Sequence, residues 1–208
     1  MPLQNRVDPY GQLYAVDARG AWMGNRGVLH NSAGEIVAQW RSRRWITCVL
    51  RFKGIRRKVF APHRYSELFF LDEATSLAAG HRPCAECRRN RFQEFSIAWS
   101  AGRRGSASPQ PARADEIDRV VHADRVHRRG IKKTYEAVLS SLPPGAMIDR
   151  EGRPFLYWGG ELRPWSFSGY GPAVGVPPRT KVRVLTPKSI VNAIQSGLVP
   201  QVHESAGG

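Results

Sequence analysis

The stretch of chain between residues 68 and 88 reads LFFLDEATSLAAGHRPCAECR. Its first three residues are large and apolar, which predicts a short buried strand. Asp72 has the character of a helix N-cap, and the small residues after it predict a short helix over residues 73–79. Gly80 can supply the left-handed conformation that ends a helix. The stretch therefore predicts a strand, a short helix and an abrupt stop, directly before two cysteines.

Cys84 and Cys87 form the strongest chemical motif in the chain. A tight turn aims the two sulfurs of a Cys-x-x-Cys motif the same way, and a helix expected over about Glu86–Trp99 brings partial positive charge that lowers the pKa of a thiol. Zinc takes four ligands, so two more must come from elsewhere. The alternatives are two unligated cysteines and a thioredoxin-like redox pair, although such a pair should follow a strand of a βαβ unit.

The other ligands must come from Cys48 and the histidines, because the chain has only three cysteines. Cys48 lies in the best strand pattern, Trp45–Phe52, where its alternation with Ile46 and Leu50 fits a buried core position equally well. His30 comes directly before a predicted turn, where a ligand is easily aimed. We therefore predict a zinc site of Cys84, Cys87, Cys48 and His30. The alternative histidines are His63, His122 and His81.

Residues 68–88 resemble the second half of the zinc-binding domain of the Ada DNA-repair protein, which has a phenylalanine strand, a short helix and then an RPC-x-x-C motif. The resemblance covers about 20 residues, roughly a tenth of the chain. It implies a four-ligand zinc site and contact with DNA, with Cys84 and Cys87 as the second ligand pair. The upstream Cys-x-x-x-Cys pair of that family, which includes a methyl acceptor, is absent here. The chain as a whole also looks like a group of bacterial proteins, and this second resemblance implies no activity.

The chain carries a formal net charge of +15 over 208 residues, which favours a polyanionic partner. Basic residues crowd the predicted hairpin between residues 41 and 58, open the helix after the cysteines, and recur at 125–133. If these groups share a face, they form a phosphate-binding surface for nucleic acid, DNA rather than RNA. The alternative is a set of unrelated solvated patches. The predicted nucleic-acid-binding residues are Arg41, Arg43, Arg44, Arg56, Arg57, Lys58, Arg88 and Arg89.

The remaining patterns predict an α+β protein of antiparallel hairpins, a zinc knuckle followed by a helix, and a second β-rich half ending in a helix. A hairpin is expected from strands 45–52 and 55–60, and another around Gly159-Gly160. We predict a zinc-binding region over 1–100, a flexible loop over 101–114 and a helix plus β-rich region over 115–208, with the two regions either separate or packed as one domain.

Two other functions compete with non-catalytic nucleic-acid binding. In a metal-dependent nuclease of the ββα type, His30 and Asn31 would act with His122 or His127. In a protein-interaction scaffold, the positive charge would serve only solubility. The chain has no stretch of about 20 apolar residues and no signal-peptide pattern at its start, which predicts a cytoplasmic protein without a membrane partner.

Overall fold

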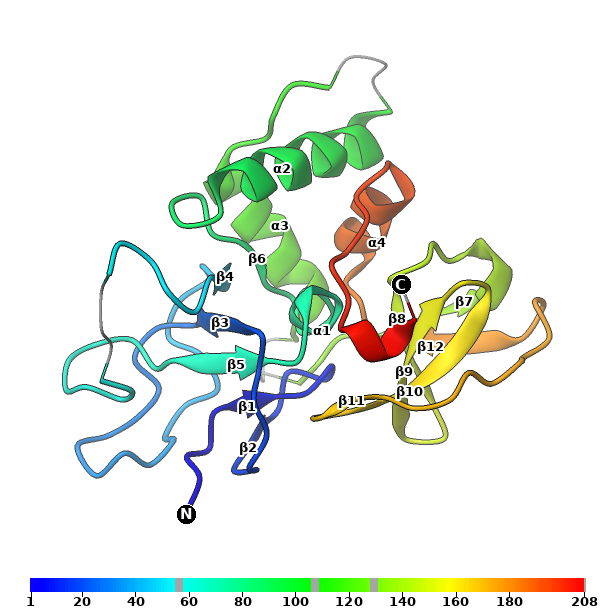
Figure 1. Ribbon diagram of the computed structural model, residues 1–208. Helices are drawn as coiled ribbons and strands as arrows, with labels where there is room; N and C mark the ends of the chain where they lie inside the picture. The colour runs from blue at the N-terminus through cyan, green and yellow to red at the C-terminus, as the bar shows by residue number, and fades with distance from the viewer. Residues whose placement is uncertain (55–57, 106–108, 128–130, 208) are drawn as a thin grey trace.

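The first sheet is built from the N-terminal part of the chain in the computed structural model, which describes every residue except 55–57, 106–108, 128–130 and 208 (Figure 1). Its strands are β1 (Arg6–Val7), β2 (Leu13–Tyr14), β3 (Trp22–Asn25), β4 (Ile46–Cys48), β5 (Leu68–Phe70) and β6 (Arg82–Pro83). They run in the order β2-β1-β5-β3-β4-β6, and only the β1–β5 and β4–β6 pairs are parallel. The predicted strand over residues 68–70 is confirmed as β5.

The second sheet is antiparallel throughout and lies on the other side of the molecule (Figure 1). Its strands are β7 (Tyr135–Val138), β8 (Met147–Arg150), β9 (Arg153–Trp158), β10 (Glu161–Ser166), β11 (Gly169–Tyr170) and β12 (Lys181–Val184). They run in the order β11-β10-β9-β8-β12-β7. Strands β9 and β10 pair through the predicted turn at Gly159-Gly160, where both glycines have positive φ angles.

Helices link the two sheets. They are α1 (Glu73–Ala78), α2 (Arg89–Arg104), α3 (Ala114–Arg125) and α4 (Lys188–Gln195). Helix α1 begins as predicted, since the Asp72 carboxylate accepts a hydrogen bond from the Thr75 backbone N–H at 2.8 Å. Gly80 follows the helix with φ +89°. Helices α2, α3 and α4 share one apolar cluster that includes Trp99, Ile117 and Ile190. The protein is thus α+β, as the sequence predicts.

The structure corrects the predicted first hairpin. The strand expected over residues 45–52 is confined to Ile46–Cys48, because its pairing with β3 ends where Cys48 lies opposite Met23. Lys53 and Gly54 then take left-handed backbone conformations. Within the expected return strand, residues 55–57 lie outside the described part of the chain, and Lys58–Phe60 are not in a strand. Phe60 instead turns with φ +57°, and its N–H donates to the buried Glu67 carboxylate at 3.0 Å.

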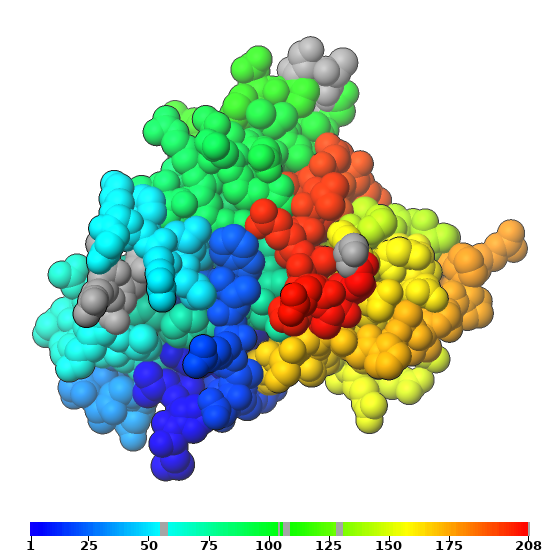
Figure 2. Space-filling view, in the orientation of Figure 1, coloured from blue at the N-terminus to red at the C-terminus, as the bar shows by residue number. Residues whose placement is uncertain are grey.

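The helix after the cysteines begins at Arg89, not Glu86, because residues 84–87 form a tight turn closed by a hydrogen bond from the Arg88 N–H to the Cys84 carbonyl at 3.2 Å. It also runs to Arg104, into the expected 101–114 loop, whose residues 106–108 are not described. The apolar cluster of α2, α3 and α4 contains residues from before and from after this loop. The C-terminal residues (red) lie between the N-terminal part (blue) and the second sheet (yellow), so the two predicted regions pack together (Figure 2).

Candidate metal centre and basic surface

Strand pairing brings Cys48 to the Cys84–Cys87 turn. Cys48 ends β4 opposite Met23 of β3, and on its other side β4 runs parallel to β6 with Thr47 beside Pro83. The Cys84 N–H continues this ladder by donating to the Thr47 carbonyl at 2.9 Å. The first residue of the turn is therefore fixed beside the last residue of the strand.

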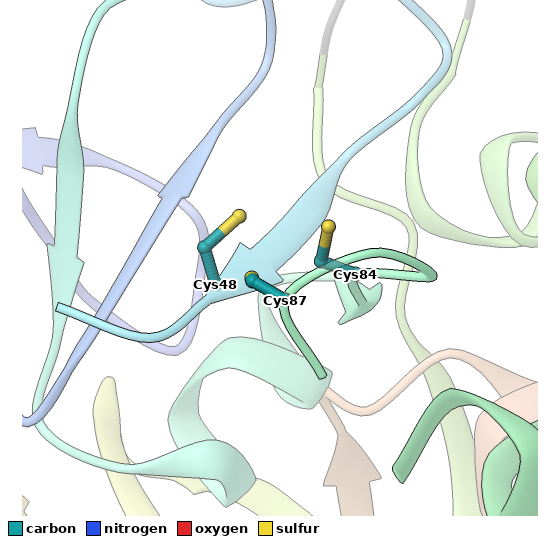
Figure 3. A group of neighbouring side chains, drawn as sticks. All are labelled: Cys48, Cys84 and Cys87. Carbon is teal, nitrogen blue, oxygen red and sulfur yellow. The ribbon is translucent and has the colours of Figure 1, made fainter. Parts of the chain in front are cut away.

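The three cysteine sulfurs lie within 4.8 Å of one another. In Figure 3, Cys48 rises from β4 while Cys84 and Cys87 come from the turn after β6, and the three side chains face a common space. Their apolar surroundings include Met23 and Phe69. A group of three soft sulfur donors in this arrangement can hold a metal ion.

Hydrogen bonding shifts the pKa values of Cys84 and Cys48 in opposite directions. The Cys84 sulfur accepts from the Cys48 thiol, then from the Cys87 thiol and from the backbone N–H groups of Cys87 and Glu86, and these interactions lower the pKa of Cys84. Donation to Cys84 and to Cys87, together with burial, raises the pKa of Cys48. The surroundings of Cys84 thus favour its thiolate, the form that binds metals.

The structure does not bring His30 into the sulfur group. Its Nδ1 atom lies 2.6 Å from the Ser66 hydroxyl, and its ring stacks on Phe60 with centroids 4.6 Å apart. The prediction of His30 as a ligand beside the cysteines is therefore wrong in this geometry. An antiparallel backbone bridge to Ile36 holds His30 in a different part of the core. Among the described residues, no further Cys, His, Asp or Glu joins the three sulfurs.

The alternative histidines are also engaged elsewhere or outside the group. His81 is fully buried, and its Nε2 accepts from the Arg26 Nε at 3.3 Å. His122 lies 2.9 Å from an Arg125 nitrogen and packs edge-on against Trp40. His63 is exposed. The nuclease arrangement of His30 with His122 gains no support, since each ring has its own separate contacts.

The predicted nucleic-acid-binding residues divide into three classes. Five of them have exposed side chains: Arg41, Arg43, Arg44, Lys58 and Arg89. None of these five forms an ion pair with another described residue. Arg56 and Arg57 lie outside the described residues. Arg88 is a correction: its side chain is only 3% exposed, and its Nη2 atom lies 2.7 Å from the Glu73 carboxylate. Arg88 is tied into the core and cannot meet a phosphate.

Segment 41–44, here called the arginine loop, is firmly held although its arginine side chains are exposed. The N–H groups of Arg41 and Ser42 donate to the Arg26 carbonyl at 2.9 and 3.0 Å. The Trp45 indole donates to the Ser42 carbonyl at 2.8 Å, and the Arg125 guanidinium donates to the Arg43 carbonyl at 2.8 Å. The loop therefore presents its charges from a fixed backbone.

The surface beside the loop has mixed charge. Arg43 and Arg44 line a hollow of about 420 Å³ together with residues from the start of α3. Those residues are Asp115, Glu116, Asp118 and Arg119.

Comparisons with family models, with curated proteins and with solved structures find no match to this chain. Within the described residues, every helix is too short or too polar to cross a membrane. The functional assignment therefore depends on the geometry of the site.

Proposed function

We propose that this protein holds a zinc ion through Cys48, Cys84 and Cys87 and uses the neighbouring arginine loop to bind nucleic acid, DNA in preference to RNA. The gathering of three sulfurs from two distant segments carries the zinc part of the proposal. Thiolates are soft ligands that suit zinc, and a site with three protein ligands keeps a fourth position for water or another ligand. The resemblance of residues 68–88 to the Ada zinc-binding domain supports the same site and favours DNA.

The nucleic-acid part of the proposal is supported by charge and by position. The net charge of +15 draws the protein to polyanions. The arginine loop leads directly into β4, the strand that ends at Cys48, so a metal that fixes Cys48 also fixes the base of the loop. Its exposed arginines can contact phosphates with little loss of backbone entropy, because the backbone is already held.

The test is the salt dependence of binding to a labelled DNA duplex between about 50 and about 200 mM salt. Each phosphate contact contributes about −0.9 to the slope of log affinity against log salt, so replacing Arg41, Arg43 and Arg44 by alanine should flatten the slope by up to about 2.7. A single-stranded RNA and an RNA duplex of the same sequence, measured in parallel, test the preference for DNA.

A matched control removes the same charge from the second sheet. Arg153 of β9, Lys181 of β12 and the nearby Arg179 are exposed, and their triple alanine variant should keep the wild-type slope. Zinc content and circular dichroism should be the same for both variants. Equal effects of the two triple variants would show that the attraction is general. Either that result or no binding near about 150 mM salt would overturn the nucleic-acid proposal, and neither would affect the zinc proposal.

A further inference from the structure

Arg26, Arg125 and Lys132 lie close to Trp45 in the interior. The sequence suggests a surface position for Arg125 and Lys132. The guanidinium carbons of Arg26 and Arg125 lie 4.0 and 3.8 Å from the Trp45 ring centroid. Both arginines are only 1% exposed. Together with Lys132 they line a small cavity that is also bordered by Trp45 and by the N-terminal segment at Gly11. Its volume is about 10 Å³, room for about one water molecule.

The hydrogen bonds of these side chains leave donors unused at the cavity. Arg26 donates to the Gly11 carbonyl at 2.8 Å and to the ring of His81, while its Nη2 atom has no partner among the described residues. Arg125 donates to the Gly80 carbonyl at 2.8 Å, while its Nε atom finds no acceptor in the part of the chain that the structure describes. A buried N–H of a charged group that has no acceptor is strongly unfavourable, which calls for an acceptor in this space.

The local carboxylates do not balance the charge. The Arg26 and Arg125 hydrogen bonds described above go to neutral groups, and Lys132 donates to the Ala78 carbonyl. Asp8 is the nearby acid, and burial raises its pKa to about 6, whereas Asp118 is already paired with Arg82 at 2.8 Å. Burial and the neighbouring Arg26 lower the pKa of Lys132 to about 7. The cluster therefore holds more positive than negative charge in a poorly solvated place.

We propose that this cavity binds one small monatomic anion, of which chloride is the natural probe, between Arg26, Arg125 and Lys132. An anion accepts the unused N–H groups and also neutralises the excess charge, whereas a water molecule would only accept the hydrogen bonds. The cavity is too small for a phosphate group, so the site is separate from the proposed nucleic-acid surface. It stands whether or not the protein binds DNA.

The experiment compares thermal unfolding in sodium chloride and in sodium gluconate at equal ionic strength. A bound chloride should raise the unfolding midpoint by about 5–10 °C for each hundredfold increase in chloride above its dissociation constant, because binding to the folded state alone stabilises it. Gluconate is too large for the cavity and should give no such rise. Crystals grown in bromide should show an anomalous-scattering peak between Arg26, Arg125 and Lys132.

The neighbouring lysine provides a matched control. Lys132→Gln removes a cation that lines the cavity, and Lys133→Gln removes the same charge from a side chain that donates to the Ala123 carbonyl outside it. The chloride-dependent rise should be lost or greatly reduced in Lys132→Gln and kept in Lys133→Gln. If the wild type unfolds at the same temperature in both salts, or if the cavity shows no bromide peak, water fills it and the proposal fails. An equal loss in both lysine variants would also overturn it.

Discussion

Cys48 illustrates how a single residue acquires a role through strand register. Its sequence pattern fits both a buried strand position and a metal ligand, and the structure places it in both, at 7% exposure and beside the sulfurs of Cys84 and Cys87. His30 has the opposite outcome. It is buried as well, but its contacts are Ser66 and Phe60.

These two residues give the first prediction. Cys48→Ser should lower the zinc content from about one ion per chain to a small fraction of that, because a hydroxyl is a much weaker zinc ligand than a thiolate. His30→Ala should lose stability but keep its zinc. The measurement is metal content by mass spectrometry after dialysis against a weak chelator. Equal zinc loss in both variants would place His30 in the site and contradict the geometry described here.

Helix α1 is the element that ties the molecule together, although it spans only Glu73–Ala78 and is buried throughout. Its N-cap carboxylate, Asp72, also accepts from the Tyr170 hydroxyl at 2.7 Å, which connects the helix to the second sheet. The Glu73 carboxylate binds Arg88 and Arg91 of the α2 region at 2.7 and 2.6 Å. The short helix thus anchors both sheets and the longest helix.

Glu73 carries the second prediction. Burial alone would raise its pKa, but the Arg91 and Arg88 guanidinium groups outweigh burial and lower it. The stabilisation is therefore present above the ordinary carboxyl pKa of 4.5 and is lost as the pH falls through the lower value of the folded protein. Glu73→Gln should reduce the free energy of unfolding at pH 7 by about 3–5 kcal/mol, because it leaves buried cations without their partner.

Urea unfolding at pH 7 and in acid tests this prediction. The difference between wild type and Glu73→Gln should shrink as wild-type Glu73 becomes protonated. Glu94→Gln is the control, since Glu94 also pairs with Arg91 but its side chain is 60% exposed. That variant should change the free energy of unfolding by less than about 1 kcal/mol. A Glu94 effect as large as that of Glu73 would contradict the account.

At the scale of the whole molecule, the two sheets depend on a shared helical core. Trp99 of α2, Ile117 of α3 and Ile190 of α4 are completely buried in one cluster. Another cluster joins α1 with Met147 and Leu156 of the second sheet and with Ala206 near the C-terminus. We therefore expect the chain to unfold as one cooperative unit.

Ile190 provides the third prediction. Ile190→Ala should lower the free energy of unfolding by about 2–5 kcal/mol, because it leaves a cavity where three helices meet. The midpoint should shift equally whether unfolding is followed by tryptophan fluorescence or by cysteine reactivity. Ile97→Ala, at a partly exposed position of α2, should have a much smaller effect. Two transitions, with only one of them shifted by Ile190→Ala, would instead indicate separately folding halves.

The sequence by itself determined the local course of the chain from residue 68 to 88. Strand β5, the Asp72 cap, the short helix and the stop at Gly80 all appear where the pattern predicts them. These features depend on interactions between residues only a few positions apart, so their signals are contained in a short window. The same holds for the turn at Gly159-Gly160 and for the pair of cysteines as a potential metal motif.

Only the tertiary structure decided which distant residues meet. The register between β4 and β6 selects Cys48 and leaves His30 elsewhere, and strands as short as β1 and β2 have no periodicity for a sequence pattern to reveal. Arginines are usually surface residues, yet Arg88 is buried against the ring of Trp22 in β3 and Arg125 against the ring of Trp45, directly before β4. An arginine carries the same charge in either place, and its surroundings are set by contacts between segments far apart in the chain.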